Sequence, residues 1–198
     1  MSNPGLEHFK ALDRIWKYLN NYPDLGTYYD YNKNILEILG YTDADWGGDI
    51  VGRKSTSGYL FLLNNNIISW NSILQKTVAL SSCESEYMAL KEAIRELIYL
   101  NNLILYFNTF NNNINNNKIP IILTDSESAL KLANNPEFHK RSKHIDIIYH
   151  FIREAIADKK AQLGYINTKK QLADGFTKGL DNTKHKTFIE SLNLKNIP

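Results

Sequence analysis

The hydrophobic period of the chain changes near residue 80, and this change constrains the fold more than any other feature. Before it, apolar residues gather in short strand-like segments at residues 26–31, 35–41, 57–63 and 67–70. From residue 82 to residue 107 they follow helical spacing instead, at Tyr87, Leu90, Ile94, Leu97, Ile98 and Leu105. The pattern predicts an antiparallel β meander followed by one long amphipathic helix.

Two polar segments separate the predicted strands. The asparagines at 64–66 lie between two strand-like segments, and asparagine tolerates positive φ, so they favour a hairpin. Residues 42–46, Thr-Asp-Ala-Asp-Trp, are predicted to form an acidic turn at the end of the strand at 35–41.

The second half of the chain alternates between strand and helix patterns. Strands are predicted at residues 119–123 and 162–166, and helices at 126–134, from a basic loop at 139–143 through residue 158, and at 170–178. A further amphipathic helix is predicted at residues 9–19, and the asparagine-rich stretch at 108–117 is predicted to be a surface loop. This order favours an α/β fold with a mixed sheet, in which early strands are antiparallel and late strands parallel.

The 198-residue chain is long enough for one sizeable core, and its net charge of +2 identifies no partner by itself. The charge is unevenly spread, since the residues from 138 onward include twelve Lys or Arg and six Asp or Glu. This asymmetry is typical of a basic nucleic-acid flank beside an acidic metal site, although an ordinary solvated surface has the same composition. The lone Cys83, the lack of zinc-ligand spacing and the lack of an apolar stretch of about 18 residues indicate an intracellular protein that does not span a membrane.

Four carboxylates stand where this layout could bring them together. Asp43 and Asp125 lie at predicted strand ends, Glu86 lies in a first helical turn, and Asp174 lies in a late helix. Each alone is commonly a helix cap or a solvated charge. Together they would repel one another unless divalent ions with oxygen ligands were bound, and two such ions about 3.5–4 Å apart are suited to phosphodiester cleavage.

The register of two of these acids is open to an alternative. Asp45 follows Asp43 by two residues, and alternation along a strand places both on one face. Glu84 precedes Glu86 by two residues and would lie about 200° away on a helix, so only one of the two can face the site. We expect Glu86, because the apolar residues that follow it form the buried side of the helix.

Six segments occur in an order that resembles a known family: YTDADW, GRKSTSGYLFLL, ISWNSILQKTVALSSCESEYMAL, LTDSESALKLA, KRSKHIDIIYHFIRE and QLADGFTK. Together they are similar to the ribonuclease H domain of copia-type retrotransposon Pol polyproteins, over residues 39–180. The helix at 9–19 and the YPDLG that follows resemble the tail of the reverse transcriptase. The resemblance implies a division into an N-terminal helix at 1–24, a ribonuclease H-like domain at 25–182 and a C-terminal tail or helix at 183–198.

This resemblance implies a mixed five-stranded sheet flanked by helices and an Asp-Glu-Asp-Asp active site, filled here by Asp43, Glu86, Asp125 and Asp174. Asp43 would bridge two Mg²⁺ ions, for which Mn²⁺ could substitute, while Glu86 and Asp125 would complete one ion site and Asp174 would hold the other. The implied reaction cuts the RNA strand of an RNA/DNA hybrid and leaves a 3′-hydroxyl and a 5′-phosphate. The implied partners are the hybrid and the reverse transcriptase domain of the same polyprotein, with no membrane and no small-molecule cofactor.

Three groups of residues are candidates for contact with the nucleic acid. Ser81 and Ser82 precede the helix of Glu86 and could bind a phosphate or a 2′-hydroxyl, or could cap the helix. Arg53 and Lys54 lie in a turn before a strand and could hold the backbone, or could be an exposed turn. The densest basic cluster could contact the DNA strand; it contains Lys140, Arg141, Lys143 and His144.

An active endonuclease specific for hybrids is the leading hypothesis, and retained carboxylates favour it. The alternatives are a decayed or co-opted module that binds nucleic acid without cutting it, and a structural domain that supports an attached reverse transcriptase. An integrase-like nuclease would use a triad of acids and leave one of the four unexplained. By the same resemblance, the protein is expected in the cytoplasm, in virus-like particles, or in the nucleus.

Overall fold

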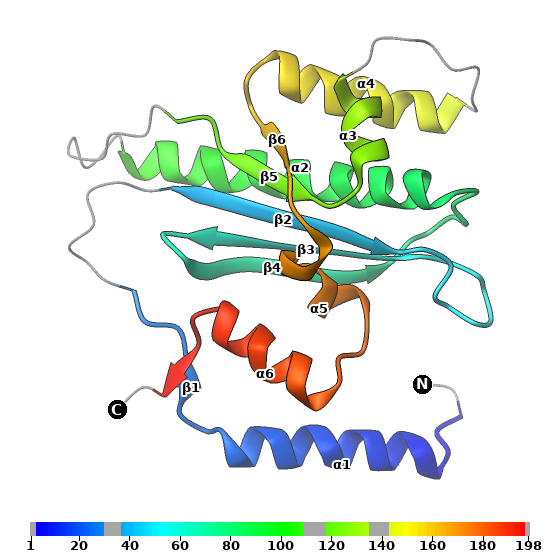
Figure 1. The fold of residues 1–198 in the computed structure, drawn as a ribbon, viewed down its shortest axis with the longest axis vertical. Coiled ribbons are helices and arrows are strands. Elements are labelled where there is room, and N and C mark those ends of the chain that lie inside the picture. Colours follow the sequence, from blue (N-terminus) through cyan, green and yellow to red (C-terminus); the bar gives the residue numbers. More distant parts are fainter. Residues whose placement is uncertain (1–2, 30–36, 109–117, 135–142, 197–198) are drawn as a thin grey trace.

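The computed structural model describes residues 3–29, 37–108, 118–134 and 143–196, and within them a five-stranded sheet forms the centre of the molecule (Figure 1). Its strand order is β4-β3-β2-β5-β6. The first three strands pair antiparallel, whereas β5 pairs parallel with β2 and β6 pairs parallel with β5. The bounds are β2 Ile38–Asp45, β3 Thr56–Leu63, β4 Asn66–Leu74, β5 Ile121–Thr124 and β6 Gln162–Tyr165. The mixed sheet predicted from the sequence is therefore confirmed.

The predicted hairpin joins β3 to β4. Asn64 and Asn65 both adopt positive φ, 51° and 70°, as expected of a two-residue hairpin turn whose twist matches that of the flanking strands. Asparagine adopts this left-handed region more readily than other residues with a side chain, so the local sequence selects the turn.

Helices cover both faces of the sheet (Figure 1). One face carries α2 (Ser82–Asn108), α3 (Glu127–Asn134) and α4 (Lys143–Ala157), and the other carries α5 (Asp174–Thr177) and α6 (Asn182–Ser191). Successive side chains of β3 point to opposite faces of the sheet, so this strand contributes to two cores. Phe61 packs in the core beneath α2. Leu60 and Leu62 pack in a second core with Ala173 and Leu192. Helices α2 and α5 approach β2 and β3 from opposite sides of the sheet.

Three predicted elements differ from the structure. The strand β2 continues through Asp45, where an acidic turn at 42–46 was expected, because β3 pairs with it along its whole length. Of the strand predicted at 26–31, only β1 (Leu25–Gly26) forms, and residues 30 and 31 lie outside the described residues. The helix predicted at 170–178 is instead a 3-10 turn, Thr168–Lys170, followed by the single helical turn of α5.

The N-terminal helix α1 (Leu6–Asn21) lies beside α6, where the Tyr18 ring contacts the ring of His185 (Figure 1). Near it, β1 pairs with β7 (Lys195–Asn196), so sequence-distant segments meet at this end of the molecule. The asparagine-rich stretch lies almost entirely outside the described residues. Within the described residues, every helix is too short or too polar to cross a bilayer.

Candidate active site

Two of the predicted carboxylates meet because their strands are parallel neighbours. Tyr41 of β2 pairs with Leu123 of β5, and Asp43 and Asp125 each follow that pair by two residues. Both acids therefore lie at the carboxyl edge of the sheet centre, where side chains from adjacent parallel strands converge. Asp43 is 2% exposed, so the fold holds this carboxylate in the protein interior.

The third carboxylate comes from the start of α2, which crosses the sheet beside these strands. Oxygen atoms of Asp43, Glu86 and Asp125 all lie within 4.8 Å of one another. The Glu86 carboxylate accepts a hydrogen bond from the backbone of Ala44, but its Oε2 atom is buried and has no hydrogen-bond partner. A buried acceptor without a partner is costly, so this oxygen is available to a bound cation.

Burial and the repulsion of neighbouring carboxylates favour the protonated forms of Glu86 and Asp43. Burial raises the pKa of Glu86 to about 9, and the charges of Asp43 and Asp125 add to the rise. Burial also raises the pKa of Asp43 to about 6, with the Thr177 hydroxyl and Lys178 opposing the rise. Three clustered carboxylates that repel one another, one with an unpartnered oxygen, fit a hard divalent cation that takes oxygen ligands.

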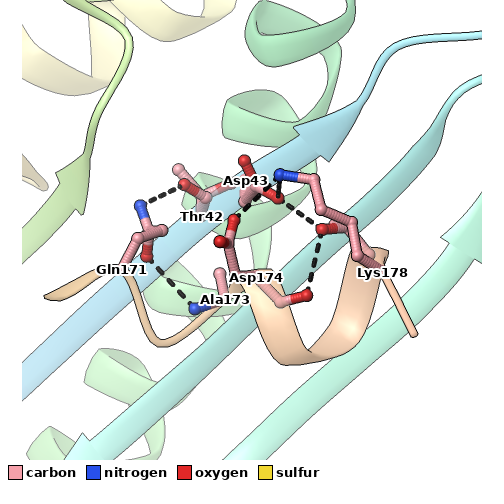
Figure 2. Close-up of polar contacts among 7 residues, drawn as sticks. Thr42, Asp43, Gln171, Ala173, Asp174 and Lys178 are labelled. Carbon is pink, nitrogen blue, oxygen red and sulfur yellow. Dashed lines mark hydrogen bonds and ion pairs between the residues drawn. The ribbon is translucent and has the colours of Figure 1, made fainter. Parts of the chain in front are cut away.

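The fourth predicted acid, Asp174, lies beside this cluster but outside it. The Lys178 ammonium lies 3.0 Å from Asp174 Oδ1 and 3.6 Å from Asp43 Oδ2, and Figure 2 shows it next to both carboxylates. The Thr177 hydroxyl donates to Asp43 Oδ2 from the same helical turn. The carboxylate of Asp174 is close enough to raise the pKa of Asp43.

A buried amide fixes α5 against β2. Gln171 is 5% exposed; its Nε2 donates to the backbone carbonyl of Thr42 at 3.0 Å, and its Oε1 accepts from the backbone of Ala173 at 3.1 Å (Figure 2). The segment that carries Asp174 is thereby attached to the residue that precedes Asp43. The two hydrogen bonds also interrupt the helix that the sequence pattern predicted across residues 170–178, because Gln171 stays extended.

The alternative acids have other environments. Glu84 Oε2 accepts from the backbone of Leu80 at 2.9 Å, and its own backbone donates to Ser81 Oγ at 3.2 Å. Glu84 thus completes the N-terminal cap of α2 while Glu86 faces the cluster. Asp45 is partly exposed and lies against the loop at Gly48, so of the two β2 aspartates only Asp43 joins the three-carboxylate cluster.

The relatives of the chain are transposon polyproteins. No protein-family model matches it. It is 39% identical over 184 residues, 93% of its length, to the retrovirus-related Pol polyprotein from transposon TNT 1-94 of Nicotiana tabacum. It is 36% identical over all 198 residues to the corresponding polyprotein from transposon RE1 of Arabidopsis thaliana. The chain belongs to the retrovirus-related Pol polyprotein family. It spans 13% of the length of each of these two relatives.

The fold of this Pol-family chain is that of ribonuclease H. The N-terminal RNase H domain of a Mycobacterium tuberculosis protein, solved as a fusion with maltose-binding protein, matches it with a TM-score of 0.51 at 9% identity. The match covers 79% of this chain and 98% of that one. Sequence motifs and fold therefore agree, and the resemblance stated from the motifs is confirmed.

The predicted nucleic-acid contacts of the Pol-family chain are dispersed. Ser81 caps α2 near the carboxylate cluster, and Ser82 is exposed beside it. Arg53 is exposed with a φ of 52° in the turn before β3, and Lys54 follows it. Of the basic cluster, Lys143 and His144 begin α4, whereas Lys140 and Arg141 lie outside the described residues.

Four residues around the site were not singled out in the sequence: Gly58, Gln171, Thr177 and Lys178. All lie within the segments that carry the family resemblance. Thr177 and Lys178 follow Asp174 by three and four residues, which places their side chains on its side of a helix, and this spacing was the available signal. Nothing in the sequence alone shows that this helical turn rests on Asp43.

Proposed function

We propose that this chain hydrolyses the RNA strand of RNA/DNA hybrids with the help of bound divalent ions. The cluster of Asp43, Glu86 and Asp125, with its unpartnered Glu86 oxygen, is the observation that carries the proposal. Membership of the Pol family supports it, because Pol polyproteins of retrotransposons serve reverse transcription, which produces such hybrids. The ribonuclease H fold supports it as well.

Each carboxylate has a distinct part in the proposal. Asp43, Glu86 and Asp125 would hold one Mg²⁺ or Mn²⁺, and Asp43 with Asp174 would hold a second. The ions would supply the Lewis acidity that activates a water for in-line attack and stabilises the leaving 3′-oxygen. The Thr177 hydroxyl orients Asp43, and Gln171 holds the segment that carries Asp174.

The proposed partners are the hybrid and the reverse transcriptase domain of the same polyprotein. Ser81 and Ser82, at the N-terminus of the helix that carries Glu86, are suited to contact a phosphate or a 2′-hydroxyl near the scissile bond. Arg53, Lys54 and the basic residues around Lys143 would hold the nucleic-acid backbone, independently of sequence.

The test is cleavage of a hybrid whose RNA strand carries a 5′ label, with Mg²⁺ or Mn²⁺ and with EDTA. We expect metal-dependent cutting by the wild type and none by Asp125→Asn. Asp158→Asn is the matched control, because Asp158 is exposed and pairs with Lys160 at 2.8 Å, outside the cluster. A DNA duplex of the same sequence should remain intact. A wild type that binds the hybrid and leaves it uncut with either ion would contradict the proposal and support the non-catalytic binding module.

A further inference from the structure

A lysine lies between two of the proposed ion ligands. Lys178 Nζ is 3.0 Å from Asp174 Oδ1 and 3.6 Å from Asp43 Oδ2 (Figure 2). Within the described residues, Lys178 is the only basic side chain in an ion pair with either of these carboxylates. Its ammonium therefore stands on the side of Asp43 that faces Asp174.

The backbone fixes this arrangement. The Lys178 amide donates to the carbonyl of Asp174 at 3.0 Å, which closes the single turn of α5. The neighbouring Thr177 donates to Asp43, and the turn rests on Gly58 of β3. The root of the lysine is thus held over Asp43, while its side chain remains 44% exposed and can turn outward into solvent.

We propose that Lys178 is a built-in counter-ion that occupies the Asp43–Asp174 side of the site and competes there with a divalent cation. The inference rests on the proposed function, because it concerns the ions which that function requires. The two ion positions then bind divalent cations with different affinities. The cluster of Asp43, Glu86 and Asp125 is open to an ion, whereas Asp174 becomes a ligand only after the Lys178 ammonium moves away.

Lys178 is a positioning residue in this proposal, since it acts through the carboxylates. It keeps Asp43 and Asp174 together when no ion is bound, because two carboxylates with a cation between them repel each other less. It also raises the concentration of divalent ion needed to fill the second position. A contact between the same ammonium and a substrate phosphate would instead strengthen hybrid binding and leave ion binding unchanged.

The experiment is calorimetric titration of Mn²⁺ into the metal-free full chain, without nucleic acid, for the wild type, Lys178→Met and Lys184→Met. Lys184 is the matched control because it pairs with Asp181 at 3.8 Å on the exposed surface of α6. We expect the second Mn²⁺ to bind Lys178→Met about tenfold more tightly than the wild type, the size expected when one partly solvated charge is removed at this distance. The first ion should change less, and Lys184→Met should match the wild type.

Two further variants keep the test informative. Lys178→Arg retains the charge and should leave the second ion weak, and Lys178→Gln replaces Lys178→Met if the latter does not fold by circular dichroism. Equal affinities for the second ion in the wild type and the neutral variants would overturn the proposal. So would weaker hybrid binding with unchanged ion binding, which would assign Lys178 to a phosphate. If neither the wild type nor any variant binds Mn²⁺ at millimolar concentration, both this proposal and the proposed metal-dependent function are contradicted.

Discussion

Gly58 of β3 lies directly opposite Asp43 of β2, and α5 packs against Gly58 where another residue would carry a side chain. A Cβ atom at Gly58 would lie 2.7 Å from Thr177 Cγ2, 3.0 Å from Phe176 Cβ and 3.1 Å from the carbonyl oxygen of Ala173. The first of these atoms belongs to Thr177, which makes the hydrogen bond to Asp43, and the second belongs to its neighbour Phe176. The lack of a side chain at Gly58 is therefore what allows Thr177 to reach Asp43.

Gly58→Ala should displace α5 and destabilise the protein. Overpacking of this kind costs about 1–3 kcal/mol, because backbone as well as side chains must shift. Urea denaturation measures the loss, and hybrid cleavage should fall with it as Thr177 and Asp174 move away from Asp43. Gly179→Ala is the control, since a Cβ there meets nothing within 4 Å and its effect should stay within about 0.5 kcal/mol. Equal stability of Gly58→Ala and the wild type would show that α5 does not depend on this close approach.

The sequence predicted those parts of the fold that local patterns determine. The hairpin follows from two asparagines, α2 from its helical period, and the parallel strand β5 from a short apolar segment. The end of β2 was not predicted from the sequence, because Thr42 and Asp43 are polar and were interpreted as a turn. In the structure both residues are buried through the pairing of β2 with β3. A buried polar strand residue has no signal in hydrophobic periodicity.

The candidate site, like the fold, was predicted from the sequence only in part. The order of the motifs identified Asp43, Glu86 and Asp125, which the structure brings together. Lys178 carried no comparable signal, because a lysine four residues after an aspartate is most often a solvated helix pair. Its meaning depends on the tertiary position of α5 over Asp43, which the buried Gln171 and the bare Gly58 determine.

Gln171→Ala should loosen the attachment of α5 to β2. The change leaves the Thr42 carbonyl and the Ala173 amide without the partners they have at 3.0 and 3.1 Å. Buried groups without partners cost about 1–3 kcal/mol, which chemical denaturation can measure. Gln162→Ala is the control because Gln162 is exposed on β6, and it should change stability little. If both variants were equally stable, solvent would be able to replace the Gln171 contacts.

Alanine variants of Glu84 and Glu86 should differ in the property they lose: stability for Glu84 and ion binding for Glu86. Glu84→Ala removes the acceptor for the Leu80 amide and should lower stability by about 0.5–2 kcal/mol, as loss of a helix cap does, while Mn²⁺ binding persists. Glu86→Ala should abolish binding of the first ion, because it removes the buried carboxylate oxygen that is available to a cation. Thermal melts with and without Mn²⁺ distinguish the two. The reverse pattern would assign the ligand role to Glu84.

Binding of the first ion should depend on pH. The pKa of Glu86 is raised to about 9 and that of Asp43 to about 6, so between these values Glu86 is protonated and Asp43 ionised. An ion must displace the Glu86 proton, and its apparent affinity should rise by up to about tenfold per pH unit toward pH 9. Titration of Mn²⁺ between these two pKa values measures the slope, and Glu84→Ala should retain it. A flat profile would mean that Glu86 is already ionised or is not a ligand.

The same pKa predicts how the stability of the metal-free protein changes with pH. The ordinary pKa of Glu86 is 4.5, and folding raises it to about 9, so between these values the folded state holds a proton that the unfolded state has lost. Stability must then fall as pH rises through this window, because the unfolded state binds fewer protons there. Glu86→Gln removes the titration, so its melting temperature should fall less than that of the wild type between pH 5 and pH 8.5 in EDTA. The two proteins should be most alike near pH 5. If their melting temperatures instead ran parallel across the range, the Glu86 carboxylate would not carry the raised pKa, and the buried cluster would have to relieve its repulsion elsewhere.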